Sequence, residues 1–454
     1  MKEIIRKLKR NGLLTNRGPK LSAIQSLSWL EIVDIALDIE NTIRKSYQRV
    51  RSPIFSHTAS LNLGGGTIEC MEIECRLSRV RKLARFASLY CDEVFISSFL
   101  ADYKDPDDWA GLEFIQRALY NDLILIHELV PLIKEGLVKF FSPITNVCFS
   151  CQAKQFLGEN AVIQFDKQYK KLKQQYLENL TVNCELVEDE YTFELDCPPP
   201  FLDHPHYLCG SSPPNPIVKR RTIFNRINSG VKVNASKTLT KELDFHTDLA
   251  HNVATNAIFG LASSGTIQTS FLTENDIHIS FLNSLHKENI ARQKNLIALK
   301  HLSSMVPFVE DVQIKDLLKL RRREEGAFNS YRKALNEAID NFGGIADSFT
   351  ERDAKELHAD VINPTLIDLE RKVKKAKRDL IKKPFRSITG IVGVLSFGLL
   401  TDLITPDLAA IAKTIGLVKF GSDMIEQTMT VGDKEDAIKS EHFYFLWKLK
   451  QKAM

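Results

Sequence analysis

Short apolar runs alternate with longer amphipathic stretches in the first third of the chain. The runs at 59–63, 93–97 and 137–141 predict strands, because apolar and β-favouring residues are concentrated there. The stretches between them, 67–90 and 108–134, repeat apolar residues at three and four positions and predict helices. Connections of this length allow parallel crossovers, so the pattern predicts a βαβαβ unit with helices packed on a parallel sheet.

The rest of the chain follows other patterns. Residues 22–50 predict a helix, and residues 142–240 predict an irregular Pro/Cys-rich subdomain with one charged helix at 165–178. Helices are predicted after that, at 246–259, 273–289, 310–341 and 350–383. The predicted fold class is α+β, with these divisions: 1–50, a basic segment and helix; 51–145, the α/β unit; 146–240, the Pro/Cys-rich subdomain; 241–385, a helical domain; 386–454, an apolar hairpin and an aromatic-basic tail.

The carboxyl-terminal region joins a basic run to an uncharged one. Residues 371–386 contain nine Lys or Arg and one Asp, whereas residues 387–401 carry no charge. A spanning helix needs about 20 apolar residues, so a conventional transmembrane segment is not predicted. We expect a buried helical hairpin, because Asp402 and Lys413 would be costly in lipid. Conditional membrane contact through residues 371–420 is the alternative.

Composition excludes several classes of protein without selecting one. The chain has 454 residues, 44% hydrophobic and 26% charged, with a net charge of +4. These values disfavour wholesale disorder, a collagen-like repeat and a polytopic membrane protein. The basic amino terminus has no apolar core typical of a secretory signal, and the eight Cys are scattered between positions 70 and 209. We therefore expect a cytoplasmic protein with reduced thiols.

The first candidate site is the edge where the predicted parallel strands end. Ligands of open parallel sheets bind beyond the carboxyl ends of the strands. Here the first strand runs into Gly64, Gly65 and Gly66, whose N–H groups could approach a phosphate at a helix amino terminus. The spacing matches no phosphate-binding fingerprint, so a tight strand-to-helix turn is the simpler explanation. Carboxylates of the loop 102–108 could hold a divalent cation there, although helix capping explains them equally well.

A second candidate site is a zinc centre in the Pro/Cys-rich region. Cys148 and Cys151 form a CxxC pair, the usual first half of a thiolate zinc site. We expect His206 and Cys209 to supply the second half, with Cys184, Cys197 and His204 as other candidates. A structural zinc would hold an irregular segment together. The alternative is that these Cys are buried as small apolar residues.

Several segments of the chain share features with known sequences: the segments 89–97 and 132–143, the pair Cys148 and Cys151, the helix containing Leu320, Arg321, Glu325, Phe328, Tyr331 and Arg332, and the tail 445–450. In these segments the sequence resembles a family of uncharacterised bacterial proteins associated with mobile elements and anti-phage defence loci. The resemblance implies a bacterial cytosolic defence protein and gives no residue a role.

The function expected from these observations is non-catalytic. We expect an interaction or regulatory component of a bacterial anti-phage defence or stress-response assembly, which associates with a protein partner or a second copy through its helical carboxyl half. The sequence assigns no catalytic residue and leaves open whether the protein is an enzyme. The alternatives are an enzyme that processes a nucleotide or phosphoester at Gly64–Gly66, and a membrane-perturbing effector that exposes residues 387–420.

Overall fold

The chain forms two compact units in the computed structural model. Unit 1 contains Met1–Ala87 and Cys91–Leu296, and unit 2 contains Ser88–Tyr90 and Ile297–Met454. The five-part division predicted from the sequence is finer than this and stays a prediction. The structure describes residues 1–46, 55–67, 71–104, 111–142, 151, 154, 159–187, 190–202, 205–210, 226–227, 231–285, 293–343, 350–382, 438 and 441–453.

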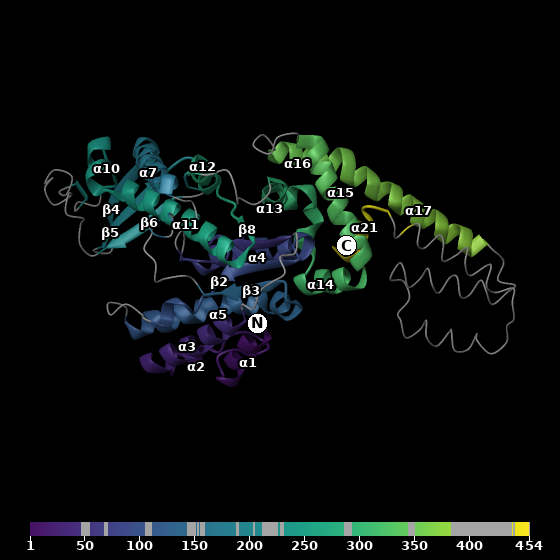
Figure 1. Ribbon diagram of the computed structural model, residues 1–454, viewed down its shortest axis with the longest axis horizontal. Helices are drawn as coiled ribbons and strands as arrows, with labels where there is room; N and C mark the ends of the chain where they lie inside the picture. The colour runs from purple at the N-terminus through teal and green to yellow at the C-terminus, as the bar shows by residue number, and fades with distance from the viewer. Residues whose placement is uncertain are drawn as a thin grey trace. The chain divides into compact units, whose positions relative to one another are not determined.

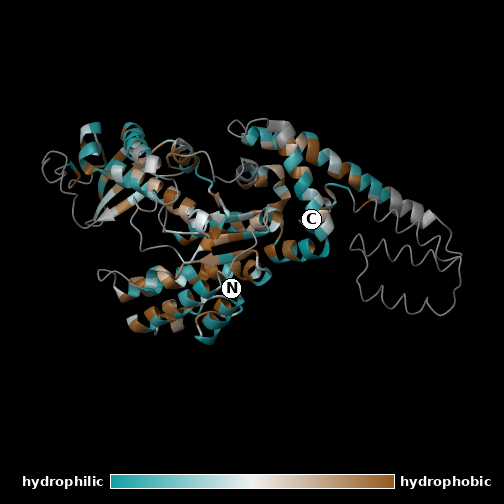
Figure 2. Cartoon of the chain, viewed as in Figure 1, coloured by the Kyte–Doolittle hydropathy of each residue, from teal (hydrophilic) through white to brown (hydrophobic). Residues whose placement is uncertain are grey.

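A four-stranded parallel sheet lies at the centre of unit 1 (Figure 1). Its strand order is β3-β2-β1-β8, and every neighbouring pair is parallel. The predicted βαβαβ order is confirmed, but the first strand was predicted too late: it ends at Ala59, and most of the predicted strand 59–63 lies in the turn that Gly64 N–H closes on the Ser60 carbonyl. The fourth strand, β8, was not predicted from the sequence. Figure 2 shows hydrophobic residues concentrated on these strands. The strands are β1 (Ser56–Ala59), β2 (Glu93–Ser97), β3 (Val138–Phe141) and β8 (Ser270–Leu272), and the crossover helices are α4 (Ile73–Tyr90) and α5 (Leu112–Glu135).

Helices cover both faces of this sheet. His57 of β1 lies beside Phe86 of α4, with ring centroids 6.2 Å apart. Thr58 points to the opposite face, because side chains alternate along a strand, and it is in register with Phe271 of β8. A Cβ atom on Gly260 would lie 2.0 Å from the Phe271 ring. The helix that carries Gly260, α11 (Phe245–Ile267), therefore packs on the face opposite to α4.

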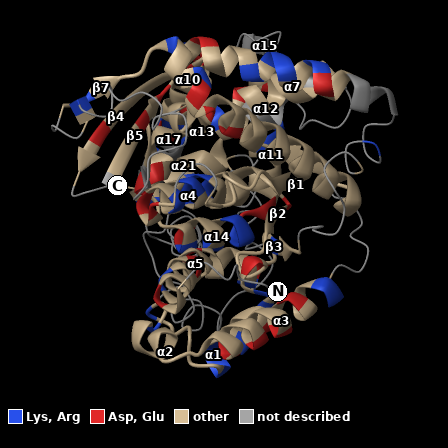
Figure 3. Ribbon diagram, turned by 90° about the vertical axis from the view of Figure 1, so that its left-hand side faces the viewer, with Lys and Arg blue, Asp and Glu red and all other residues tan. Residues whose placement is uncertain are grey.

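Three amino-terminal helices complete this part of unit 1. The helix predicted at 22–50 is divided in two, because Ser28 starts a new helix with a capping box: its side chain accepts from the Glu31 N–H, and Glu31 accepts from the Ser28 N–H. Gln116 of α5 donates to the carbonyls of Gln25 and Leu27, which fixes the turn between the two helices. Figure 3 shows charges of both signs along the first and third helices. The helices are α1 (Lys2–Arg10), α2 (Leu21–Gln25) and α3 (Trp29–Lys45).

The described part of the predicted Pro/Cys-rich subdomain is regular, not irregular. It contains an antiparallel sheet of order β6-β5-β4-β7. Alternating side chains such as Val182, Cys184, Phe193 and Leu195 are buried in a hydrophobic core that includes residues of the neighbouring helices. The elements are α7 (Glu159–Asn179), β4 (Thr181–Val187), β5 (Glu190–Asp196), β6 (His206–Gly210), β7 (Val233–Asn234), α10 (Lys237–Leu243) and α12 (Asp276–Leu285).

Unit 2 is helical throughout its described part, which confirms the predicted helical carboxyl half. The aromatic-basic tail belongs to its core: Phe445 lies 5.3 Å from Phe328 and 5.6 Å from Tyr331 between ring centroids. The predicted helix 310–341 is divided near Glu324, where the backbone leaves the helical conformation. The elements are α13 (Gln293–Met305), which begins in unit 1, η2 (Pro307–Asp311), α14 (Ile314–Arg323), α15 (Glu325–Gly343), α16 (Glu351–Leu357), the π-helical turn η4 (His358–Ile362), α17 (Asn363–Lys382) and α21 (Tyr444–Ala453).

The last turn of α4 is also part of unit 2. Arg321 donates to the Ser88 carbonyl at 3.0 Å, and Arg332 donates to the Tyr90 carbonyl at 3.1 Å. Both guanidinium groups lie over the Phe328 ring, at 4.2 and 4.8 Å from its centroid. Carbonyls at a helix carboxyl end carry partial negative charge, so arginine stabilises them. Arg321 is therefore engaged within the unit.

No helix in the described residues is both long enough and apolar enough to cross a membrane. Residues 371–382 of the basic run lie in α17. The predicted apolar hairpin at 387–420 lies outside the described residues, so its burial or membrane contact stays a prediction.

The close packing of α11 on β8 gives the first testable prediction. We expect Gly260→Ala to lower the thermal stability of the protein, because its methyl group would overlap the Phe271 ring. Phe271→Leu in the same chain should recover part of the loss by making room for the methyl group. Gly111→Ala is the control, since its Cβ would have no neighbour within 4 Å. Thermal unfolding followed by circular dichroism measures all four proteins, and an unchanged midpoint for Gly260→Ala would contradict the packing.

Candidate functional site

The strand order places a candidate ligand site at the carboxyl edge of the parallel sheet. The chain proceeds from β1 to β2 to β3 on one side, whereas β8 lies on the other side of β1. Ligands of open α/β sheets bind where the strand order reverses in this way. Here the reversal lies between β1 and β8, and the segments that follow these strands begin at Ser60 and Thr273.

The three consecutive glycines form a closed turn at this edge. The N–H groups of Gly64, Gly65 and Gly66 donate to the carbonyls of Ser60, Asn62 and Leu61 at 2.9, 2.9 and 2.8 Å. A phosphate could use these N–H groups only after the turn had opened. The predicted cofactor site at Gly64–Gly66 therefore stays a prediction, while the geometry is that of a strand-to-helix turn.

Close packing explains why glycine occupies the middle of the turn. Gly65 has a φ of +90°, which side chains rarely adopt. A Cβ atom there would lie 2.6 Å from Val80 Cγ2 and 3.3 Å from Leu125 Cδ1. The turn is thus pressed against α4 and α5 at once.

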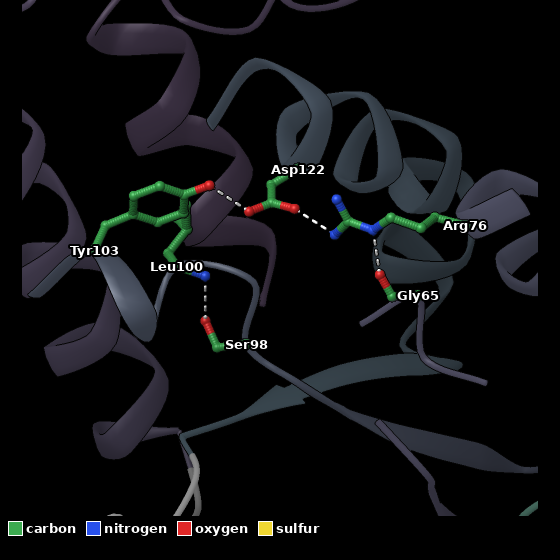
Figure 4. Close-up of polar contacts among 6 residues, drawn as sticks. All are labelled: Gly65, Arg76, Ser98, Leu100, Tyr103 and Asp122. Carbon is green, nitrogen blue, oxygen red and sulfur yellow. Dashed lines mark hydrogen bonds and ion pairs between the residues drawn. The ribbon is translucent and has the colours of Figure 1, made fainter. Parts of the chain in front are cut away.

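A buried polar network holds this turn in place (Figure 4). Arg76 of α4 donates through Nε to the Gly65 carbonyl at 2.7 Å and through Nη2 to Asp122 Oδ1 of α5 at 2.5 Å. Tyr103 donates to the other carboxylate oxygen of Asp122 at 2.6 Å. Burial and the adjacent Asp122 raise the pKa of Tyr103 well above its ordinary value, so its hydroxyl stays a donor. The network joins α4, α5, the glycine turn and the segment after β2.

Two buried side chains in the segments that follow β1 and β8 are not fully hydrogen-bonded. Asn62 is 3% exposed, and neither its amide nitrogen nor its amide oxygen has a hydrogen-bond partner in the described structure. His278, in α12, is 1% exposed; its Nδ1 lies 2.9 Å from Thr273 Oγ1, and its Nε2 has no partner there. Buried polar groups are nearly always paired, so each exception needs a reason. Both exceptions lie within six residues of a strand end at the point where the strand order reverses.

This pair of side chains is uncharged at neutral pH. Burial lowers the pKa of His278 from 6.5 to about 4, so its imidazole is neutral. The nearby cation Lys82 is bound to Glu274 at 2.6 Å, and Arg76 is bound to Asp122. Asn62, His278 and Thr273 offer amide, imidazole and hydroxyl groups, whereas these four charged groups are bound to one another.

The structure tests the predicted zinc ligands only in part. Cys148 lies outside the described residues, Cys151 is exposed, and His206 and Cys209 are on one strand, β6. No group of three or more His, Cys, Asp or Glu suited to a metal ion occurs among the residues described. The zinc site at Cys148, Cys151, His206 and Cys209 stays a prediction.

Two of the other zinc candidates are core residues. Cys184 and Cys197 are 1% and 2% exposed, and burial raises the pKa of their thiols to about 11 and about 12. Thiols that resist deprotonation are poor metal ligands, because zinc binds the thiolate. These two Cys therefore agree with the alternative to zinc binding, in which Cys side chains are buried as small apolar residues.

The acidic loop is described only in part. Asp102 lies in η1 (Asp102–Lys104), and residues 105–108 lie outside the described part.

Sequence reasoning missed the residues that organise this edge. Asp122 lies on the apolar stripe of its helix, with Leu119 and Ile126 three or four positions away, and all three are buried. A single carboxylate in such a stripe is a signal for a buried ion pair, and Arg76 has the same position in α4, four residues before Val80. Asn62 gave no comparable signal, since Asn is common in turns.

Comparison of the chain with family models, with curated proteins and with solved structures finds no match. The fold and the edge define a protein with a parallel α/β unit in which the strand order reverses at β1.

The buried ion pair gives the second prediction. We expect Asp122→Asn to lower the free energy of unfolding of unit 1 by about 3–5 kcal/mol, because it leaves the Arg76 guanidinium buried without a counter-charge. Arg76→Met combined with Asp122→Leu should recover much of this loss, since an apolar pair leaves no buried charge. Urea unfolding measures both, and Glu356→Gln in the exposed Arg352–Glu356 pair is the control that should leave the curve unchanged. A loss no larger than that of the control would contradict the structural role of the pair.

Buried imidazoles give the third prediction, a pH dependence of stability. Burial holds the pKa of both His57 and His278 at about 4, whereas the unfolded side chains titrate near 6.5. The unfolded chain binds protons that the folded chain excludes, so stability falls as the pH drops from 6.5 toward 4. Each imidazole should cost about 2 kcal/mol between pH 7.5 and pH 5.

Urea unfolding at the two pH values tests this dependence. His57→Leu should lose less stability on acidification than the unsubstituted protein, because one of the two titrations is gone. His251→Leu replaces an exposed imidazole and should keep the full dependence. An equal loss in all three proteins would show that His57 is not the source.

Proposed function

We propose that this protein is a non-catalytic, ligand-responsive regulatory component of a bacterial anti-phage defence or stress-response assembly in the cytoplasm. Its α/β unit binds a small polar molecule at the carboxyl edge between β1 and β8. Its helical unit associates with a protein partner or with a second copy of the chain.

One observation supports the ligand site above all others. Asn62 and His278 are buried without full hydrogen bonding, and they follow the two strands between which the strand order reverses. Leaving a buried polar group unpaired costs about 1–3 kcal/mol. A ligand that bonds to both groups would remove this cost and stabilise the edge. Binding would thereby be coupled to the stability of unit 1.

Other observations favour a binding protein over an enzyme of nucleotide or phosphoester chemistry. The glycine N–H groups are used within their own turn. The ionisable side chains nearest that turn, Arg76, Asp122 and Tyr103, bind one another in a buried network. Groups held in this way position a loop, whereas acid–base catalysis needs a group within reach of the substrate proton.

The proposed association through unit 2 has a different support. Its described part consists of helices around an aromatic core, so the outer faces of these helices are available for association. α17 carries Ile367, 39% exposed, on a helix that is otherwise rich in charge. The connection to defence comes from the resemblance of the sequence alone.

A ligand screen by thermal shift tests the proposed function and is the fourth prediction. The full chain is mixed with a panel of nucleosides, nucleotides, sugar phosphates and amino acids. We expect at least one class to raise the unfolding midpoint, by an amount that grows with ligand concentration as mass action requires. If no member of the panel shifts the midpoint, the proposal of a ligand site fails.

Two matched variants locate the effect. Thr273→Val removes the hydroxyl that holds His278, and we expect it to reduce the shift. Thr58→Val removes a similar hydroxyl, bound to Thr269 at 2.6 Å within the sheet, and should leave the shift unchanged. An equal reduction in both variants would place the ligand elsewhere.

A further inference from the structure

The antiparallel sheet of unit 1 ends on the strand β6. In the order β6-β5-β4-β7, β6 pairs with β5 over five residues, from His206 opposite Leu195 to Gly210 opposite Tyr191. It pairs with no other strand among the described residues. An edge strand presents N–H and C=O groups along its outer side, to which another strand can bind. β6 is therefore positioned to accept one more strand.

The opposite edge of this sheet is protected, whereas β6 is not. β7 has only two residues, Val233 and Asn234, and Lys232 just before it pairs with Glu194 at 2.7 Å. Short length and charge are two devices by which proteins prevent the edges of sheets from pairing. The sequence of β6, HYLCG, contains no Asp, Glu, Lys, Arg or Pro. It therefore lacks the features that would keep a second strand away.

Two side chains of β6 are exposed, one on each face of the sheet. Leu208 is in register with Phe193, a core residue that is 3% exposed, so Leu208 lies on the core-facing side, yet it is 44% exposed. Tyr207 is in register with Glu194, to which its hydroxyl donates at 2.9 Å, and it is 61% exposed. The apolar row through Phe193 therefore ends on Leu208 at the open edge, where an added strand would cover it.

A second copy of β6 fits this edge. Two antiparallel copies of one strand pair through a two-fold axis perpendicular to the sheet, and a pairing centred on Leu208 places this residue opposite its own copy. Residues directly opposite each other lie on the same face, so the two Leu208 side chains would meet on the core-facing side, with Cβ atoms about 5 Å apart. Tyr207 would lie opposite Cys209 of the second copy. The strand thus brings apolar side chains together at its centre and opposes no like charges.

We propose that the chain self-associates through β6, by antiparallel pairing of two copies of this strand about Leu208. The pairing joins two four-stranded sheets into one continuous sheet. The proposal goes beyond the ligand site and places a contact between copies on unit 1, in addition to the association proposed for unit 2. A contact of five residues on each side is small beside the roughly 1,200–2,000 Å² that stable interfaces bury, so the dimer is reversible and forms as the protein concentration rises.

Sedimentation velocity of the full chain over a range of concentrations tests the proposal. We expect a monomer–dimer equilibrium. Leu208→Lys places two positive charges opposite each other at the centre of the contact, so it should raise the dissociation constant of the dimer about ten-fold or more. Val187→Lys is the matched control, because Val187 is 46% exposed at the end of β4 in the same sheet. It should leave the dissociation constant unchanged.

A disulfide tests the register of the pairing. Leu208→Cys places two thiols opposite each other, at a Cα separation of about 4–6 Å that a disulfide can span. With oxidised glutathione, at a protein concentration at which the dimer forms, we expect a covalent dimer in higher yield than from the unsubstituted protein. Val187→Cys should give no such increase.

Circular dichroism separates association from folding, since both substituted side chains are exposed and the thermal midpoints of the variants should match that of the unsubstituted protein. A monomer at every concentration would overturn the proposal, and so would a dimer that Leu208→Lys leaves equally stable. In the second case the copies would meet on another surface, and the proposed association of unit 2 would stand. No increase in covalent dimer from Leu208→Cys would overturn the pairing about this residue.

Discussion

The buried ion pair between Arg76 and Asp122 is the interaction on which the carboxyl edge of unit 1 depends. It joins the two crossover helices, and through its second bond Arg76 also holds the Gly65 carbonyl. Two charges removed from water are stable only if their remaining hydrogen bonds are satisfied. Tyr103 and Gly65 provide those bonds, so the ion pair, the turn and the segment after β2 form one unit. The edge is therefore rigid on the side of β2, where α4 and α5 meet.

That rigidity has a consequence for the side of β8. Because Arg76 and Lys82 are bound to carboxylates and the glycine turn uses its own N–H groups, the atoms without partners on Asn62 and His278 are those of neutral groups. A neutral site in a low-dielectric environment discriminates by the direction of hydrogen bonds rather than by charge. The glycines, which suggest phosphate binding in the sequence, thus form part of the scaffold of this edge.

Much of the architecture could be predicted from periodicity. The strands at 93–97 and 137–141 and their crossover helices follow directly from short apolar runs and amphipathic repeats. β8 was not predicted because it has only three residues. It is a strand only through its pairing with β1, from which it is separated by more than 200 positions. β4 and β5 were hidden by the surrounding prolines, although their side chains alternate as strands require. The break between α2 and α3 could have been predicted from the sequence, since Ser28 followed three residues later by Glu31 is the pattern of a capping box.

The site itself was predictable only as a location. The rule that ligands bind at strand ends selects the carboxyl edge of the sheet, but the chemistry of that edge depends on which groups are already paired. That information exists only in three dimensions. Lack of a partner does not mark a site by itself, since neither ring nitrogen of His57 has a hydrogen-bond partner in the described structure, although His57 lies within β1, between two paired strands. Asn62 and His278 differ because they lie beyond the strands, where the backbone ladder ends. Position and unmet bonding together, rather than either one, make the case for this edge.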